Sequence, residues 1–217
     1  MGVGGGAVAP PVVNEASSLA EQLRPMITSD LALAAIASVP RERFVPAHER
    51  ARAYENVALP IACGQTISQP LVVARMLELL ELEEGDRVLD VGTGSGYHAA
   101  LLARLAGQVW TIERHAELSG EAERAIRGLG IENVNFVVGD GSAGLPEHAP
   151  FDAINVAAAT GAAVPAALAG QLAPGGRLVA PVGVEGQRLT LLRRTRRGME
   201  ATALEPVRFV PLIVPER

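Results

Sequence analysis

Residues 88–97 read Val-Leu-Asp-Val-Gly-Thr-Gly-Ser-Gly-Tyr, an apolar run that leads into a turn with three glycines. The apolar first half of this stretch is typical of a buried strand, which we predict over 86–91, and the residues that follow predict a helix over 96–105. The glycines Gly92, Gly94 and Gly96 let the backbone turn tightly and let a ligand approach without meeting a Cβ atom. The stretch therefore predicts a ligand-binding loop between a strand and a helix.

The glycine spacing and one acidic residue indicate which ligand the loop binds. In the dinucleotide pattern G-x-G-x-x-G, the third glycine would fall on Tyr97. Asp90, directly before the loop, would repel a pyrophosphate but suits a ligand that carries an ammonium and a sulfonium. A nicotinamide-dependent dehydrogenase is therefore disfavoured, and S-adenosylmethionine is favoured.

Two further acids are predicted at the ends of the next two strands. Glu113 can accept hydrogen bonds from both ribose hydroxyls, and Asp140 can accept one from the adenine amine. Each acid also has a simpler interpretation: Asp90 could cap the next helix, Glu113 could be a surface charge, and Asp140 could make a turn. Three acids at three successive strand ends, together with the glycine loop, favour an S-adenosylmethionine site.

Strands and helices alternate along most of the chain, which predicts a parallel sheet with helices on both faces. We expect an α/β, doubly wound, mostly parallel seven-stranded sheet with antiparallel edge strands and an N-terminal helical segment. Strands are predicted over 86–91, 108–112, 133–138, 151–156, 175–182, 187–194 and 204–212. Helices are predicted over 15–38 (two), 69–80, 96–105, 115–128 and near 163–171, and 41–68 is predicted to be irregular.

The predicted domain organisation is simple. Residues 1–14, rich in Gly, Ala and Pro, read as a flexible lead-in, and 15–217 as one methyltransferase domain. Within it, 15–80 is the helical substrate wall and 86–217 the cofactor-binding sheet.

Composition restricts the partners and the compartment. The net charge of −5 argues against nucleic acid, and no apolar run is long enough to cross a membrane. The single cysteine, Cys63, is expected to be a partly buried small residue in a reducing compartment, so we expect a cytoplasmic protein, and a monomer. We expect no metal, since His48, His115 and His148 lack metal-ligand spacing, and we expect His98 on a helix surface.

Several segments resemble the signature segments of protein-L-isoaspartate O-methyltransferases, a family of class I S-adenosylmethionine-dependent enzymes. They run in order over residues 39–46, 64–70, 88–97, 111–114, 139–141, 149–152, 174–178 and 208–212. Residues 66–70 (Thr-Ile-Ser-Gln-Pro) are the most specific, because other class I methyltransferases lack them. The resemblance covers nearly the whole chain.

The resemblance implies methylation of the free α-carboxylate of L-isoaspartyl residues in proteins and peptides, with S-adenosyl-L-homocysteine as the other product. The ester then closes to a succinimide, which hydrolyses partly to normal aspartate. The resemblance also implies that the last two strands are exchanged in position relative to most class I methyltransferases.

The resemblance assigns roles to individual residues. Ser68 is the implied active-site serine, and Ile67, Ser68 and Gln69 are implied to line the methyl-donor pocket. Gly92, Gly94, Ser95 and Gly96 form the loop, Glu113 and Arg114 hold the ribose, and Asp140 and Gly141 hold the adenine. Thr66, Ser68 and the backbone near Val207 are implied to contact the substrate.

Departures from the family pattern leave alternatives open. Ala62-Cys63, Leu71 and residues 156–159 differ from the family pattern along the expected substrate wall. One alternative is therefore an enzyme that esterifies aspartate in one dedicated peptide partner, and another is a binding module without catalysis. Ser68 could also be only the cap of the helix predicted over 69–80.

Overall fold

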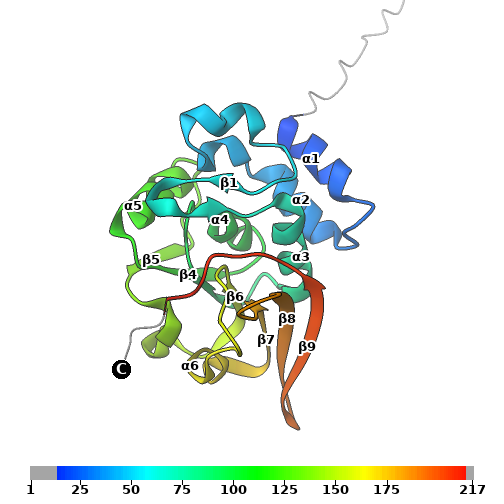
Figure 1. The fold of residues 1–217 in the computed structure, drawn as a ribbon, viewed down its shortest axis with the longest axis vertical. Coiled ribbons are helices and arrows are strands. Elements are labelled where there is room, and N and C mark those ends of the chain that lie inside the picture. The colour runs from blue at the N-terminus through cyan, green and yellow to red at the C-terminus, as the bar shows by residue number, and fades with distance from the viewer. Residues whose placement is uncertain (1–13, 214–217) are drawn as a thin grey trace, which may run out of the picture.

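The computed structural model describes residues 14–213, and its centre is a seven-stranded sheet in the order β5-β4-β3-β6-β7-β8-β9 (Figure 1). The strands are β3 (Arg87–Val91), β4 (Gln108–Glu113), β5 (Val134–Val138), β6 (Phe151–Val156), β7 (Leu172–Val182), β8 (Arg188–Thr195) and β9 (Gly198–Pro206). The first five in the chain pair in parallel, and β8 and β9 are antiparallel additions. The predicted fold class is therefore confirmed.

The last strand differs from its predicted position. We predicted 204–212, whereas β9 begins at Gly198, directly after a turn at Arg196 and Arg197. β8 lies beside β7, and β9 lies at the edge. Residues 207–213 are therefore not in the sheet, and they are free to run back across its carboxyl edge.

Helices cover both faces of the sheet, because alternate strand residues point to opposite sides. One core contains Val88 together with α3 (Pro70–Leu80) and α4 (Tyr97–Ala103), and α5 (Ala116–Arg127) contributes Ile126 to it. The other core contains Leu89 and is covered by α6 (Ala166–Ala169). The helix that we predicted near 163–171 is thus only one turn long.

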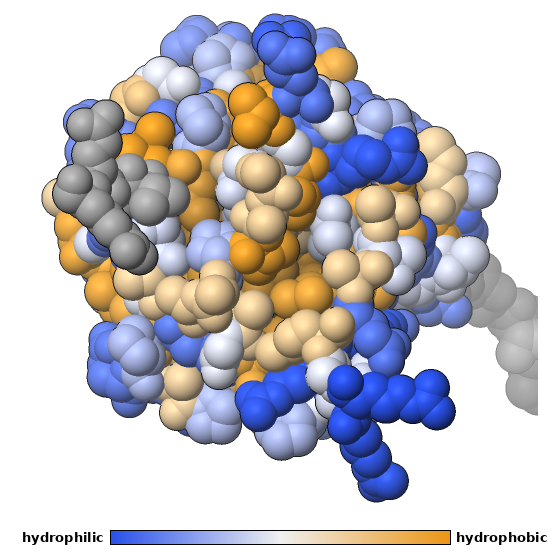
Figure 2. All heavy atoms as spheres, turned by 60° about the horizontal axis from the view of Figure 1, so that its bottom comes forward, coloured by the Kyte–Doolittle hydropathy of each residue, from blue (hydrophilic) through white to orange (hydrophobic). Residues whose placement is uncertain are grey.

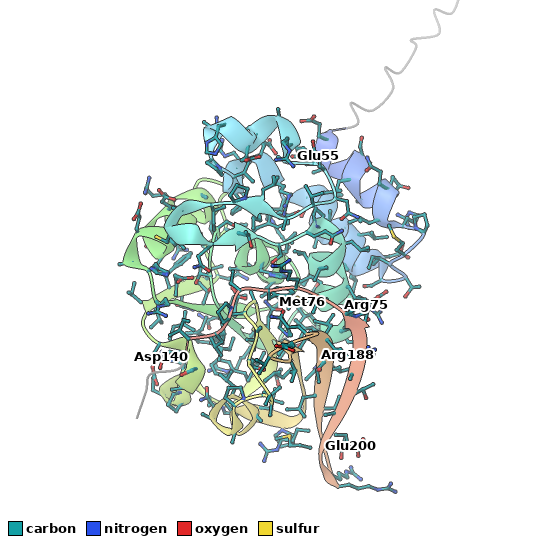
Figure 3. All side chains as sticks on the ribbon, viewed as in Figure 1. Glu55, Arg75, Met76, Asp140, Arg188 and Glu200 are labelled. Atoms are coloured by element: carbon teal, nitrogen blue, oxygen red, sulfur yellow. The ribbon has the colours of Figure 1, made fainter. Side chains whose placement is uncertain are left out.

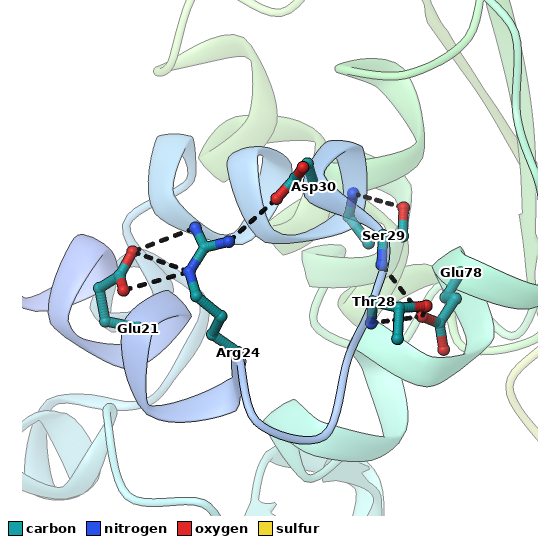
Figure 4. A network of polar contacts seen from close by, with 7 residues as sticks. Glu21, Arg24, Thr28, Ser29, Asp30 and Glu78 are labelled. Carbon is teal, nitrogen blue, oxygen red and sulfur yellow. Dashed lines mark hydrogen bonds and ion pairs between the residues drawn. The ribbon is translucent and has the colours of Figure 1, made fainter.

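The N-terminal helix α1 (Glu15–Leu23) packs against α2 (Asp30–Ser38), and α2 packs onto α3 (Figure 4). Glu78 on α3 accepts hydrogen bonds from the backbone N–H and hydroxyl of Thr28, both at 2.7 Å, and from the N–H of Ser29 at 3.0 Å. Asn14 caps α1 by accepting from the N–H of Ser17 at 2.7 Å. Residue 14 is thus structured, and the rest of the predicted lead-in lies outside the described residues.

Residues 41–68 contain more structure than predicted. Three short 3-10 helices, η1 (Arg41–Phe44), η2 (Ala47–Arg52) and η3 (Ala62–Gly64), alternate with a two-stranded ribbon of β1 (Leu59–Pro60) and β2 (Thr66–Ile67). We call residues 53–68 the strap, because they cross above α4 at the top of the molecule (Figure 1). The strap carries Thr66, Ile67 and Ser68.

The β8–β9 hairpin projects from the body of the molecule and carries five arginines, four of them between Arg193 and the turn. Arg193 pairs with Glu81 at 2.7 Å, and Arg194 donates to the carbonyl of Leu172, so these two hold the hairpin against the core. Arg196 and Arg197 are exposed at the turn. Figure 2 brings this end forward and shows hydrophilic side chains gathered on a projection.

Within residues 14–213, no helix is long and apolar enough to cross a membrane.

Candidate active site

A cavity of about 870 Å³ lies at the carboxyl ends of β3, β4 and β5. Its walls come from the glycine loop, the strap and the C-terminal segment 207–213. Ten of the predicted site residues line it together: Thr66, Ile67, Ser68, Gly92, Gly94, Ser95, Glu113, Arg114, Asp140 and Gly141. Four predicted residues do not line it: Gln69, Asp90, Gly96 and Val207.

The glycine loop has the backbone that its sequence predicts. Gly92 and Gly94 have φ values of 90° and 52°, which side chains rarely adopt, and both line the cavity. Gly96 serves a different purpose. A Cβ atom there would lie 2.8 Å from the Cβ of Ala122, so Gly96 lets the start of α4 pack against α5 and does not itself admit a ligand.

Glu113 is buried at the end of β4, and it is not a surface charge. Its Oε2 accepts from the N–H of Gly94 at 2.9 Å, and its Oε1 accepts from the N–H of His115 at 3.0 Å. A carboxylate has about four lone-pair sites. One site on each oxygen is therefore left for a ligand in the cavity, which fits a pair of ribose hydroxyls.

Asp140 both makes a turn and lines the cavity, so its two interpretations are compatible. It accepts from the N–H and the hydroxyl of Ser142, both at 2.9 Å. Gly141 is required beside it, because a Cβ atom there would lie 2.6 Å from Val91. Asp140 follows β5, on the side of the molecule that the C-terminal segment reaches (Figure 3).

Asp90 lies behind the loop and not in the cavity wall, which corrects the expected direct contact. Its carboxylate is fully buried and accepts from the hydroxyl of Thr111 and the amide of Asn155, both at 2.8 Å. Burial raises the pKa of Asp90 to about 6, although the two hydrogen bonds oppose this. Asp90 thus acts within the sheet, where β3, β4 and β6 meet.

Ser68 is not the cap of α3. The helix begins at Pro70, and its Leu71 N–H is instead capped by the side chain of Asn56 at 2.9 Å. Gln69 also turns toward this residue, because its amide donates to the carbonyl of Asn56 at 2.9 Å. Within residues 14–213, the Ser68 hydroxyl has no hydrogen-bond partner, and Ser68 lines the cavity. It is therefore available to a ligand.

The C-terminal segment is the largest part of the wall that was not predicted. Val210, Pro211, Leu212 and Ile213 line the cavity. The N–H of Ala159 donates to Val210, and the N–H of Leu212 donates to Ala159, both at 2.8 Å. Val207 itself lies outside the wall, and its N–H donates to the carbonyl of Gln187 at 2.9 Å. The signature-like residues 208–212 were the signal for this wall.

Cys63 and His98 also differ from expectation. Cys63 is exposed at the cavity, where its sulfur lies 3.8 Å from Glu117. Partial desolvation and, next, the negative charge of Glu117 raise the pKa of its thiol. His98 is buried and not on a helix surface, because the apolar helix α4 is covered on all sides. Burial, with the nearby charge of Arg41, lowers the pKa of His98 to about 4.

Replacing His98 with glutamine is expected to reduce acid sensitivity. In the wild type, the unfolded state binds a proton near the ordinary pKa of 6.5 and the folded state only near 4, so stability falls as the pH falls through this window. Between pH 7 and pH 5 the wild type should lose about 2 kcal/mol more than His98→Gln. Asp90 has the opposite effect between about pH 4 and 6, but it is present in both proteins. Urea titrations at both pH values measure the difference, and equal losses would contradict it.

The cavity fits S-adenosylmethionine by the chemistry of its walls. Two carboxylates with unused lone pairs, Glu113 and Asp140, suit the ribose and adenine donors, and the glycine backbone lies open beside them. The apolar residues Ile67, Ile112 and Leu212 complete the wall. The volume is in the range of sites for small organic ligands.

Two solved structures share this architecture. One protein-L-isoaspartate O-methyltransferase superposes with a TM-score of 0.81 at 31% identity, covering 89% of this chain and 64% of the other. A second, from Plasmodium falciparum, is described as a protein-L-isoaspartate O-methyltransferase (β-aspartate methyltransferase) in complex with S-adenosyl-L-homocysteine. It superposes with a TM-score of 0.79 at 27% identity, covering 92% of this chain and 99% of the other.

Sequence comparisons lead to the same family. A family model described as protein-L-isoaspartate(D-aspartate) O-methyltransferase matches residues 14–217. Protein-L-isoaspartate O-methyltransferase 1 of Rhodopseudomonas palustris is 48% identical over 216 residues, covering 94% of this chain and 88% of the relative. The protein-L-isoaspartate O-methyltransferase of Roseiflexus castenholzii is 53% identical over 192 residues, covering 88% of each chain. With fold, cavity and sequence in agreement, the chain belongs to the protein-L-isoaspartate(D-aspartate) O-methyltransferase family.

Proposed function

We propose that the protein methylates the free α-carboxylate of L-isoaspartyl residues in damaged proteins and peptides, with S-adenosylmethionine as methyl donor. The observation that carries the proposal is the position of Ser68. Ser68 belongs to residues 66–70, the segment most specific to the family, and it lines the cofactor cavity. Its hydroxyl makes no hydrogen bond within residues 14–213. The family match over residues 14–217 supports the same substrate class.

The cofactor, when bound, supplies an activated methyl group on a sulfonium. In this proposal Glu113 and Arg114 hold its ribose, and Asp140 and Gly141 hold its adenine. Thr93, which lines the cavity, connects the loop to Asp90 through Thr111: the two hydroxyl oxygens are 2.6 Å apart, and Thr111 donates to Asp90. Asp90 thereby holds the loop without touching the cofactor.

The acceptor needs no general base. A peptide α-carboxylate has a pKa of about 3.5, so it is ionised at neutral pH. Ser68 therefore acts as a hydrogen-bond donor that orients this carboxylate or its peptide. The transfer consumes one negative and one positive charge, so a site that excludes water favours it. The strap and the C-terminal segment both contribute to the cavity wall, and in this proposal they shield the reacting groups from water.

Replacing Ser68 with alanine is expected to lower kcat/KM for an isoaspartyl peptide by about 10- to 100-fold, because one orienting hydrogen bond is lost. The dissociation constant of S-adenosyl-L-homocysteine, measured by calorimetry, should change by less than about threefold. Ser38→Ala, an exposed site on α2, is the matched control. Unchanged turnover in Ser68→Ala would show that Ser68 has no part in the reaction.

The range of peptides that the protein accepts distinguishes a repair enzyme from an enzyme with one dedicated partner. The second possibility stays open because Cys63, which departs from the family pattern, is exposed in the cavity wall. The experiment is a panel of unrelated isoaspartyl peptides. A repair enzyme should methylate most of them at comparable kcat/KM. Methylation of a single sequence would favour the dedicated partner, and binding of the cofactor without turnover would favour a silent module.

The proposal includes a monomer of one domain, residues 15–217, that works in the cytoplasm without nucleic acid. A single cysteine and a net charge of −5 support the compartment and the absence of nucleic acid. Light scattering behind a sizing column tests the monomer, since a dimer would elute at twice the 22.6 kDa chain mass.

A further inference from the structure

Arg41 is a fully buried cation that the methyl transfer does not use. Its Nε donates to the carbonyl of Ala53 at 2.8 Å, its Nη1 to that of Ser68 at 2.9 Å, and its Nη2 to that of Val57 at 3.2 Å. No acidic residue within 14–213 forms an ion pair with it. Three carbonyls, all from the strap, thus take the place of a carboxylate partner.

A planar guanidinium with five donors can bind several acceptors in fixed directions, which a lysine ammonium cannot. Burial lowers the pKa of Arg41 to about 10, so it remains charged at neutral pH. Charge-assisted hydrogen bonds are roughly twice as strong as neutral ones. Arg41 therefore holds three separate points of the strap at fixed positions relative to one another.

Arg41 also connects the strap to the cofactor loop. Its guanidinium carbon lies 5.2 Å from the centre of the Tyr97 ring, and Tyr97 is the residue directly after the glycine loop. Arg41 itself begins η1, outside both the strap and the loop. The same side chain thus sets the position of Ser68 relative to the start of α4.

Asn56 is a second connection on the other side of Ser68. Its Oδ1 accepts from the N–H of Leu71 at 2.9 Å, and its carbonyl accepts from the amide of Gln69 at 2.9 Å. Arg41 therefore holds the backbone carbonyl of Ser68, and Asn56 holds the two residues Gln69 and Leu71 at the start of α3. The backbone on both sides of Ser68 is thus held in place, although its hydroxyl makes no hydrogen bond within residues 14–213.

From these contacts we propose that Arg41 and Asn56 are positioning residues, which fix the strap so that the Ser68 hydroxyl faces the methyl donor. The inference rests on the proposed function for its kinetic consequence. Neither residue touches the cavity. Loss of either should therefore impair the use of the acceptor and spare the binding of the cofactor.

The experiment compares Arg41→Lys and Asn56→Ala with the wild type, and uses Arg52→Lys as the control. Arg52 ends η2, directly before the strap, but it is exposed, and within residues 14–213 its ion pairs are with Glu49 and Glu55. Arg41→Lys should lower kcat/KM for an isoaspartyl peptide by about 10- to 100-fold, and Asn56→Ala by about 10-fold, since small misplacements are costly. The dissociation constant of S-adenosyl-L-homocysteine should stay within about threefold of the wild-type value for all three variants.

Hydrogen exchange gives a second readout that does not depend on activity. Amides in 53–69 should exchange faster in Arg41→Lys and Asn56→Ala, whereas those of 92–96 should not change. Unchanged exchange in the strap, kcat/KM within about twofold of wild type, or equal losses of activity and cofactor affinity would overturn the proposal. If Arg41→Lys does not fold, Asn56→Ala decides alone. If the wild type methylates no isoaspartyl peptide, the proposed function fails, and the exchange data still test whether Arg41 and Asn56 hold the strap.

Discussion

Replacing Glu113 with alanine is expected to weaken the binding of S-adenosyl-L-homocysteine by about 100-fold or more. The carboxylate is buried at the end of β4, and it serves two partners at once. It fixes the N–H of Gly94 and that of His115, and its remaining lone pairs face the cavity. Each charge-assisted hydrogen bond contributes about 1.5–3 kcal/mol. The variant loses the hydrogen bonds to the ligand and those that order the glycine loop, and together these losses correspond to a roughly 100-fold larger dissociation constant.

Isothermal titration calorimetry measures the change, and Glu117→Ala is the matched control. Glu117 is an exposed acid on the first turn of α5. Its loss removes the same charge from the same side of the protein but leaves the hydrogen bonds to the glycine loop in place. The affinity for S-adenosyl-L-homocysteine should therefore change by less than about threefold. Wild-type affinity in Glu113→Ala would show that the ligand does not bind at the ends of β4 and β5.

Replacing Gly96 with alanine is expected to destabilise the fold by about 3 kcal/mol. Gly96 has a φ of 88°, where a Cβ atom is strained, and the added atom would lie 2.8 Å from the Cβ and 3.2 Å from the Cα of Ala122. α4 and α5 would have to separate, and the glycine loop would move with α4. Chemical denaturation measures the loss, and cofactor affinity should fall with it.

Gly120→Ala is the control for the same substitution on the neighbouring helix. Gly120 lies inside α5, and a Cβ atom there meets nothing within 4 Å. Alanine should therefore stabilise the protein by about 0.5–1 kcal/mol, because glycine weakens helices. If Gly96→Ala were as stable as wild type, the close packing of α4 on α5 would be wrong.

The parts of the site that could be predicted from the sequence are those that follow strand ends. The glycine loop, Glu113 and Asp140 each lie at or just beyond the end of a recognisable strand. In a parallel sheet such ends converge on one edge, so local patterns were enough to bring them together. The remaining predicted wall, Thr66 to Ser68, depended on family resemblance and not on periodicity.

The parts that could not be predicted depend on contacts between distant residues. No local pattern shows that Asn56 caps a helix 15 residues later, or that residues 210–213 return to the cavity. Asp90 was expected to meet the ligand because it directly precedes the glycine loop. Its actual partners, Thr111 and Asn155, lie on other strands, so no local pattern shows them. His98 could have been predicted correctly, since Tyr97–Ala103 is apolar on nearly all sides, which is typical of a buried helix.

Methyl transfer to isoaspartyl residues can be measured with a pair of matched peptides. Two short peptides that are identical except for an aspartyl or an isoaspartyl residue at one position are incubated with the protein and labelled S-adenosylmethionine. We expect base-labile methylation of the isoaspartyl peptide only. Equal methylation of both peptides, or none of either while the cofactor still binds, would contradict it.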